Sequence, residues 1–330
     1  MGDAAVLSRA QGCLLGQLTG DALGSMVEFE SAVAIARQYP HGLHEIGPSP
    51  VWGTQAGQPT DDSELALALA RTLVARGTYD AETVVAAYAD WYESPPFDIG
   101  TTTRVALSAA AAARREGRSL VAATDKAANR ESEANGALMR QSPLAIWGHA
   151  LPQDRLADAL WQDTALTHPN HVCQDASAAV ILPLAAIIHG GLDAEAAYAQ
   201  ALAWDAAHGA SPTVTNALRA AREAPPDYER SQGHVLIALQ NAWYEALHTG
   251  SFADGVTATV MGGGDTDTNA AIAGALLGAL HGIAAVPAQW RDTVLACRPQ
   301  AGQPGVTRPR PATYWPADAL TLAAALSGWL

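Results

Sequence analysis

Charged residues are scarce in this chain, and basic residues above all. Only 16% of the 330 residues are charged, and 19 Lys and Arg face 33 Asp and Glu, which gives a net charge of −14. No basic stripe stands out along the sequence. Because phosphate groups and anionic lipid surfaces are bound by positive faces, we expect neither nucleic acid nor a membrane surface as a partner. The acidic balance suits divalent cations instead.

Cysteines and targeting signals are also few. Cys13, Cys173 and Cys297 lie far apart and form no CxxC motif. We therefore expect reduced, buried thiols, and no zinc site built from paired cysteines. The N-terminus lacks the basic and apolar regions of a secretory signal peptide. Together these features favour a cytoplasmic location.

Long uninterrupted hydrophobic segments are absent too. The two most apolar runs are residues 176–192, which carry Pro183 and His189, and residues 270–286, which carry His281. Neither reaches the roughly 20 clean residues that a bilayer crossing needs. Both runs predict buried helices.

Helical periodicity extends through most of the chain, and alanine is abundant. Apolar residues recur at helical spacing in residues 64–77, 81–93, 103–117 and 235–250. Alternating strand patterns bounded by hairpin dipeptides are absent. Hydrophobic residues make up 49% of a chain long enough to bury a full core, and no linker or repeat marks a boundary. We predict an all-α protein with a single domain over residues 1–330.

The first candidate site is "PTDDSELALALA", residues 59–70. One interpretation is a helix cap, because Asp61 with Glu64 three residues later matches a capping box. A single carboxylate is enough for that task, whereas here Thr60, Asp61 and Asp62 stand together. The extra acid favours a second role.

The second candidate site is "GGGDTDTNAAIAG", residues 262–274, in which two acids again open a helix after a flexible glycine run. Placing so many acids beside a small-residue core is costly unless cations neutralise them. Hard oxygen ligands from Thr and Asp suit Mg²⁺ or Mn²⁺ better than zinc. The two clusters therefore predict a site for two metal ions. Gly274, Gly278 and Gly282 lie four residues apart, so one face of this helix is bare backbone.

At this point the sequence resembles the ADP-ribosylglycohydrolase family almost from end to end. The similar segments, in the family's order, are residues 12–29, 59–70, 95–107, 132–140, 165–177, 233–247 and 263–282. The last of these motifs is highly specific, and a chance match to all of these segments together is not expected. The resemblance implies a compact orthogonal helical bundle. It also implies a magnesium-dependent hydrolase of the ADP-ribosylarginine type, which removes mono-ADP-ribose from protein side chains.

The resemblance carries a set of site residues with it. The implied ligands of two Mg²⁺ or Mn²⁺ ions are Thr60, Asp61, Asp62, Asp265, Asp267 and Thr268. The implied catalytic carboxylates are Glu28, Asp98 and Asp267. The implied substrate contacts are Gly100, Thr101, Ser132, Asn135, Gly136, His168 and His234. Among these, the loop with Asn135 and Gly136 is expected to hold the pyrophosphate, and His234 to stack on the nucleotide. In this interpretation the metal ions bind the ribose 2′ and 3′ hydroxyls and place a water at the anomeric carbon, or favour ring opening there.

Simpler roles remain open for two of the carboxylates. Glu28 could be a solvated helix end, and Asp98 a turn residue after two prolines. The chain also departs from the family pattern at Glu133, Ala134, Thr101, His234 and Asn269, which leaves leaving-group specificity open.

The implied partners are an ADP-ribosylated protein as substrate, ADP-ribose as product, and an ADP-ribosyltransferase or its target. Two other functions stay open. One is a magnesium-dependent phosphohydrolase that cuts the pyrophosphate of ADP-ribose. The other is a non-catalytic relative, either crystallin-like or a binder that neutralises a toxin.

Overall fold

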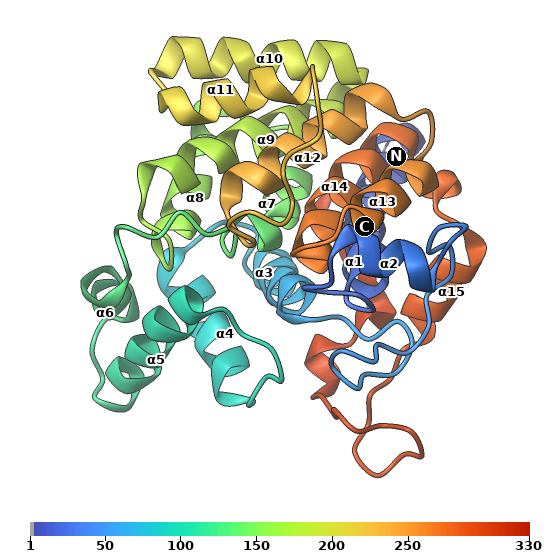
Figure 1. Cartoon of the computed structure of the whole chain (residues 1–330). Helices are drawn as coiled ribbons and strands as arrows, with labels where there is room; N and C mark the ends of the chain where they lie inside the picture. Colours follow the sequence, from blue (N-terminus) through green and yellow to red (C-terminus); the bar gives the residue numbers. More distant parts are fainter. Residues whose placement is uncertain (1–2) are drawn as a thin grey trace.

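The computed structural model describes residues 3–330, and its regular structure is helical (Figure 1). The α-helices are α1 (Ala4–Gly24), α2 (Ala32–Gln38), α3 (Asp61–Arg76), α4 (Ala81–Glu93), α5 (Thr101–Arg115), α6 (Leu120–Ala127), α7 (Ser142–Gly148), α8 (Gln153–Ala165), α9 (His171–Gly190), α10 (Ala194–His208), α11 (Pro212–Ala221), α12 (Val235–His248), α13 (Phe252–Met261), α14 (Thr266–His281), α15 (Ala288–Ala296) and α16 (Ala319–Leu326). Short 3-10 helices lie at Leu138–Arg140, Ile283–Ala285, Ala312–Tyr314 and Pro316–Asp318. Within residues 3–330, extended pairing is limited to isolated bridges. The predicted all-α fold is confirmed.

Local sequence explains where several helices begin and end. Asp80 accepts a hydrogen bond from the Thr83 amide and starts α4 at Ala81, as the periodicity predicted. Gly77 and Gly191 end α3 and α9 in the left-handed conformation. The three cysteines are free and buried, also as predicted.

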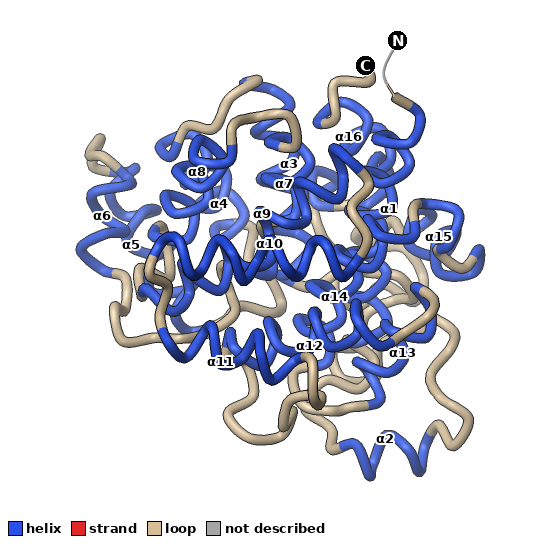
Figure 2. Tube along the Cα trace, turned by 90° about the horizontal axis from the view of Figure 1, so that it is seen from above, coloured by secondary structure: helices blue, strands red, loops and turns tan. Residues whose placement is uncertain are grey.

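Helix α9 is longer than its apolar run suggested. It begins at His171, five residues before the run at 176–192, and its 20 residues are long and apolar enough to span a bilayer by length and composition alone. The helix lies inside the bundle, however, and 78% of its most apolar window is buried. Figure 2 shows α9 beneath α10. The apolar residues of α9 therefore belong to the protein core.

The bundle is built around α14. This helix contacts α1, α9, α12 and α13, while α10 and α11 form an outer layer over α9 and α12 (Figure 1). Helices α4, α5 and α6 form a separate group in which α4 contacts α3 and, less extensively, α8. The first turns of α3, α5 and α14 meet between these parts.

Helices α1 and α14 run antiparallel at a very short distance. A Cβ atom added to Gly12 would lie 2.1 Å from the carbonyl oxygen of Gly278, and one added to Gly16 would lie 2.1 Å from that of Gly274. The same contact repeats one turn later, where Gly20 meets Ala270. Backbone therefore touches backbone along the whole crossing. This close approach brings the C-terminal end of α1 against the acidic first turn of α14.

Candidate active site

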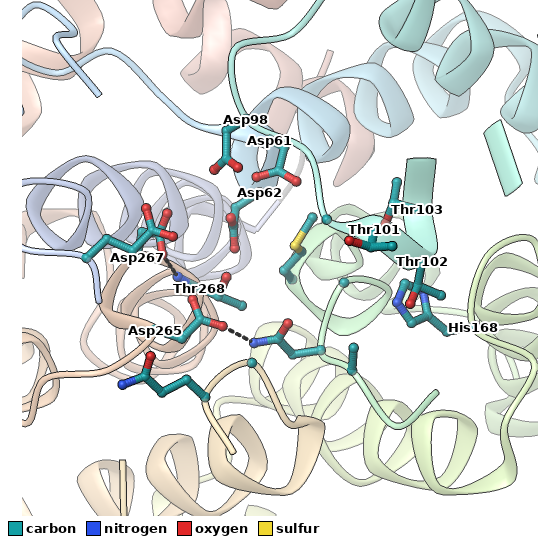
Figure 3. Close-up of a pocket in the computed structure, with 18 of the residues that line it drawn as sticks. Asp61, Asp62, Asp98, Thr101, Thr102, Thr103, His168, Asp265, Asp267 and Thr268 are labelled. Carbon is teal, nitrogen blue, oxygen red and sulfur yellow. Dashed lines mark hydrogen bonds between the residues drawn. The ribbon is translucent and has the colours of Figure 1, made fainter. Parts of the chain in front are cut away.

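A cavity of about 380 Å³ lies where these helix ends converge (Figure 3). Six carboxylates line it, from Glu28, Asp61, Asp62, Asp98, Asp265 and Asp267. In residues 3–330 no lysine or arginine belongs to its lining. In the view of Figure 3, Asp61 and Asp98 lie above Asp265. The structure thus brings together acids from four separate stretches of the chain.

The α14 side of the cavity depends on two glycines. Gly263 and Gly264 have φ angles of 77° and 76°, and a Cβ on Gly264 would lie 2.2 Å from a backbone oxygen. The turn they form places Asp265 at the N-cap of α14 and Asp267 in its first turn. The amide Nδ2 of Asn135 donates to the Oδ2 atom of Asp265 at 2.7 Å.

The α3 side does not contain the capping box that the sequence allowed. Thr60 is the N-cap residue and its side chain makes no capping bond, while Asp61 and Asp62 already belong to the first turn. The Glu64 carboxylate turns away and accepts hydrogen bonds from Arg310, at 2.7 Å and 2.8 Å, and from the Trp91 indole at 2.6 Å. The capping-box interpretation was wrong, because a buried arginine competes for the glutamate.

Glu28 and Asp98 both face the cavity. Glu28 is 6% exposed, so the alternative of a solvated helix end is also wrong. Its carboxylate, with those of Asp265 and Asp267, offers ligand atoms that all lie within 4.8 Å of one another. Trp52 donates its indole N–H to Glu28, and its ring packs 5.9 Å from that of Phe97, the residue before Asp98.

Burial of so many acids changes their proton affinity. Burial, and then the charge of Asp265, raises the pKa of Glu28 to about 8. Burial, and then the charge of Glu28, raises the pKa of Asp98 to about 8. Burial also raises the pKa of Asp62 and Asp267 well above the usual range. The cluster is therefore unfavourable as a set of bare anions.

The donor set fits a hard divalent cation. The Oδ1 atom of Asp62 is buried and has no hydrogen-bond partner in the structure. A buried carboxylate oxygen without a donor is costly, and a cation supplies the missing charge. Carboxylate and hydroxyl oxygens are the ligands that Mg²⁺ and Mn²⁺ prefer.

The opposite end of the cavity is formed by backbone and hydroxyl groups. Gly100 and the first turn of α5, Thr101–Thr103, line it together with Asn135 and Gly136. No side chain caps α5, so its first amides are available to an anion. Ser132 does not line the cavity, but its hydroxyl lies 2.9 Å from that of Thr102, which does.

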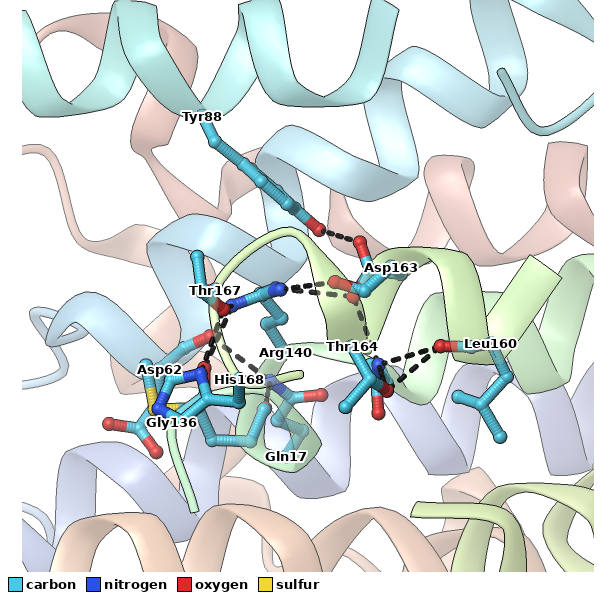
Figure 4. Close-up of polar contacts among 12 residues, drawn as sticks. Gln17, Asp62, Tyr88, Gly136, Arg140, Leu160, Asp163, Thr164, Thr167 and His168 are labelled. Carbon is cyan, nitrogen blue, oxygen red and sulfur yellow. Dashed lines mark hydrogen bonds and ion pairs between the residues drawn. The ribbon is translucent and has the colours of Figure 1, made fainter. Parts of the chain in front are cut away.

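His168 lies against this end and is held neutral. Burial, and then the charge of Arg140, lowers its pKa to about 3. Its ring packs so closely on Gly136 that a Cβ there would lie 2.9 Å from the ring. Arg140 is fully buried behind it and donates to the Gly136 carbonyl, to Thr167 and to Asp163 (Figure 4). Through its bond to the Gly136 carbonyl, the buried Arg140–Asp163 ion pair supports the loop that carries Asn135 and Gly136.

His234 lies outside the cavity lining. Its Nδ1 atom accepts the Leu236 amide hydrogen and caps α12, and its Nε2 atom lies 2.9 Å from the Glu133 carboxylate. Glu133 makes this contact with His234 and does not line the cavity either. Thr60 lies behind the lining, where its hydroxyl contacts Asp62 and Asp21.

Several residues at the site were not anticipated from the sequence. The cavity lining also includes Phe29, Thr102, Thr103, Met139, Gln232 and Gly233. The most informative omission is Asp21, a buried acid inside the apolar helix α1. Because a fully buried acid is rarely found unpaired, an aspartate inside an apolar helix predicts a hydrogen-bond or charge partner nearby.

Comparison with known proteins agrees with this geometry. A sequence model of the ADP-ribosylglycohydrolase family matches residues 2–310. The chain belongs to the ADP-ribosylglycohydrolase family. It is 32% identical to the ADP-ribosyl-[dinitrogen reductase] glycohydrolase of Rhodospirillum rubrum, over 86% of this chain and 90% of that protein. It is 31% identical to the ADP-ribosylarginine hydrolase Tri1 of Pseudomonas putida, over 87% of this chain and 74% of that protein.

A solved structure shares the fold over its whole length. It is described as an ADP-ribosylglycohydrolase-related protein complex, and it is 25% identical with a TM-score of 0.77 over 99% of both chains. Family membership assigns the chain to the glycohydrolase class of hydrolases. The resemblance noted in the sequence is thereby confirmed.

Proposed function

We propose that this ADP-ribosylglycohydrolase removes mono-ADP-ribose from modified arginine side chains of proteins, using two bound divalent cations. The cavity lining supports the proposal most strongly, because six carboxylates from four segments face one space of about 380 Å³ that no lysine or arginine among residues 3–330 lines. A cation-dependent site explains that arrangement, whereas a purely structural role does not.

The proposed ligands of two Mg²⁺ or Mn²⁺ ions are Thr60, Asp61, Asp62, Asp265, Asp267 and Thr268. They stand at the N-termini of α3 and α14, which approach each other across the cavity (Figure 3). The unpartnered Oδ1 atom of Asp62 supports this assignment. Bound there, such ions would orient ribose hydroxyls and polarise a water oxygen.

Glu28 and Asp98 are the proposed proton carriers. In the cation-free cavity the pKa of each carboxyl is raised to about 8, and bound cations would favour the ionised form, so that one carboxyl can hold a proton while the other is ionised. The protonated one delivers its proton to the departing arginine nitrogen as the anomeric C–N bond breaks. The ionised one takes a proton from the water whose oxygen forms the new C–O bond. The products are ADP-ribose and the unmodified arginine side chain of the protein, with water as the only co-reactant.

The pyrophosphate is proposed to lie at the α5 end of the cavity. Since no lysine or arginine among residues 3–330 lines the cavity, backbone amides of the α5 first turn and of Asn135–Gly136 are the proposed main donors. Neutral His168 can approach an oxygen without adding charge. Ser132 is assigned an indirect role here, through its contact with Thr102.

The metal requirement is tested with chelator and one variant. We expect EDTA to abolish hydrolysis without unfolding the protein, and Asp267→Asn to slow turnover at least about 100-fold. The matched control is Asp292→Asn, because Asp292 is an exposed carboxylate in α15. Hydrolysis at a normal rate in EDTA would refute the metal-dependent mechanism.

The arginine linkage is a second prediction. Tri1 of Pseudomonas putida, similar to this chain, is named an ADP-ribosylarginine hydrolase. A guanidinium leaving group carries delocalised positive charge, which an acidic cavity attracts. We expect ADP-ribosyl-arginine peptides to be hydrolysed faster than ADP-ribosyl-serine peptides, with salt narrowing the difference. Faster turnover of the serine-linked peptide at low salt would overturn the linkage and leave the reaction class intact.

Mass analysis of the products separates the rival functions. A glycohydrolase releases intact ADP-ribose, whereas a phosphohydrolase acting on the pyrophosphate releases AMP. A non-catalytic binder releases neither, although it retains the modified peptide.

A further inference from the structure

The first turn of α3 is capped from a different helix. The carboxylate of Asp21, in α1, accepts hydrogen bonds from the amides of Thr60 and Ser63, each at 3.2 Å, and from the Thr60 hydroxyl at 3.0 Å. Asp21 is fully buried. It therefore supplies the cap that the Thr60 side chain does not give to its own helix.

Asp21 also lies within the close α1–α14 crossing. It lies between Gly20, whose added Cβ would be 2.0 Å from the Ala270 carbonyl oxygen, and Gly24, whose added Cβ would be 2.5 Å from the Cα of Asp267. One carboxylate thus connects the helix packed on Asp267 with the first turn that carries Asp61 and Asp62. The two acidic halves of the site share this support.

The Thr60 hydroxyl has one proton and two acidic neighbours. Its Oγ1 atom lies 3.0 Å from the Oδ1 atom of Asp21 and 3.1 Å from the Oδ2 atom of Asp62. Only one of them can receive the proton, because a hydroxyl is a single donor with two acceptor lone pairs. Donation to Asp21 leaves both the Thr60 lone pairs and the Asp62 oxygen free for a cation.

We propose that Asp21 is a positioning residue of the cation site, which fixes the first turn of α3 and draws the Thr60 hydroxyl proton away from Asp62. The proposal rests on the metal-dependent function proposed above. Both carboxylate oxygens of Asp21 already accept hydrogen bonds from Thr60 or Ser63, so Asp21 acts through Thr60 and not as a ligand. Replacing a residue that orients metal ligands in this way commonly weakens metal binding by about 10- to 100-fold.

The test is a double-mutant cycle that measures Mn²⁺ binding by electron paramagnetic resonance, with unfolding in EDTA recorded for every variant. We expect Asp21→Asn and Thr60→Val each to weaken Mn²⁺ binding about 10-fold or more. We expect the double variant to be no more than about 2-fold weaker than Thr60→Val alone, because the two residues act as one unit.

The matched control is Asp205→Asn. Asp205 is also a buried aspartate that accepts a threonine hydroxyl, that of Thr215 at 3.1 Å, but it lies outside the cavity lining. This variant is expected to bind Mn²⁺ like the wild type. If Asp21→Asn does not fold, the same cycle is run with Asp21→Glu, which keeps the charge and shifts it by one methylene.

Two results overturn the inference: wild-type Mn²⁺ affinity in the Asp21 variant, or losses in the two single variants that multiply in the double variant. Failure of the wild-type protein to bind Mn²⁺ at all contradicts the proposed metal-dependent function instead. The two failures are therefore distinguishable.

Discussion

Individual side chains at the cavity owe their chemistry to burial and to one another. Burial and the charge of Asp265 raise the proton affinity of Glu28, and burial and the charge of Glu28 raise that of Asp98, since carboxylates in one poorly hydrated space resist ionising together. His168 shows the opposite response, because burial beside Arg140 disfavours its charged form. The same cavity thus keeps acids protonated and a histidine neutral.

His234 offers a prediction at this scale. Replacing it by alanine removes the α12 cap and the Glu133 pair, so we expect the free energy of unfolding to fall by about 1 kcal/mol. ADP-ribose affinity should change less than about 2-fold, because the ring lies outside the cavity lining, whereas nucleotide stacking predicts a loss of about 1 kcal/mol. Calorimetry with ADP-ribose decides between the two, and Glu133→Gln serves as the control that removes the pair alone.

At the scale of helices, the α1–α14 crossing holds the site together. Glycines in register on both helices let the backbones touch, and the hydroxyl of Thr266 donates to the Gly24 carbonyl at 2.7 Å. Phe29, just after α1, donates its amide to Gly264 at 2.7 Å. These bonds fix Glu28 beside the first turn of α14.

A single methyl group tests this crossing. Gly16→Ala places a Cβ 2.1 Å from the Gly274 carbonyl oxygen, so the helices must move apart. We expect a loss of stability of about 3 kcal/mol or more, which is the upper range for overpacking. Gly190→Ala, at the end of α9 with nothing within 4 Å, should leave stability nearly unchanged. Urea unfolding of both variants provides the comparison, and equal midpoints would contradict the close packing.

For the whole molecule, the acidic cavity links stability to pH and to cations. A carboxyl whose pKa is raised on folding binds its proton more tightly in the folded state than in the unfolded chain. Its contribution to stability is complete at low pH and is lost as the pH rises through the folded-state pKa. For Glu28 and Asp98 that loss extends from the unfolded-state pKa of about 4 to the folded-state pKa of about 8.

We therefore expect the protein in EDTA to unfold at a temperature at least about 4 °C lower at pH 8.0 than at pH 6.5. The low pKa of His168 contributes little to the pH dependence of stability between pH 6.5 and 8.0, because an unfolded histidine is already mostly neutral above its usual pKa of about 6.5. Mg²⁺ should stabilise the protein more at pH 8.0, and Glu28→Gln should reduce the pH dependence. A melting temperature in EDTA that rises from pH 6.5 to 8.0 would contradict this linkage.

The sequence by itself determined the helical fold and the acidic motifs. Local periodicity sets where a helix can form, and so the bounds of α4 and most of α3, α5 and α12 followed from residues close together in the chain. The pairs Asp61–Asp62 and Asp265–Asp267 could be recognised because each is contiguous and opens a helix. Resemblance to the family added Glu28 and Asp98, which line the cavity.

Only the tertiary structure decided which groups meet across long sequence separations. Asp21 reaches Thr60 across 39 positions, and Arg310 takes Glu64 away from the predicted capping box across 246. His234 likewise caps α12 and contacts Glu133, outside the cavity lining. A carboxylate or an imidazole can satisfy several partners equally well, so the partner it finds depends on which one the packed core holds within hydrogen-bond distance.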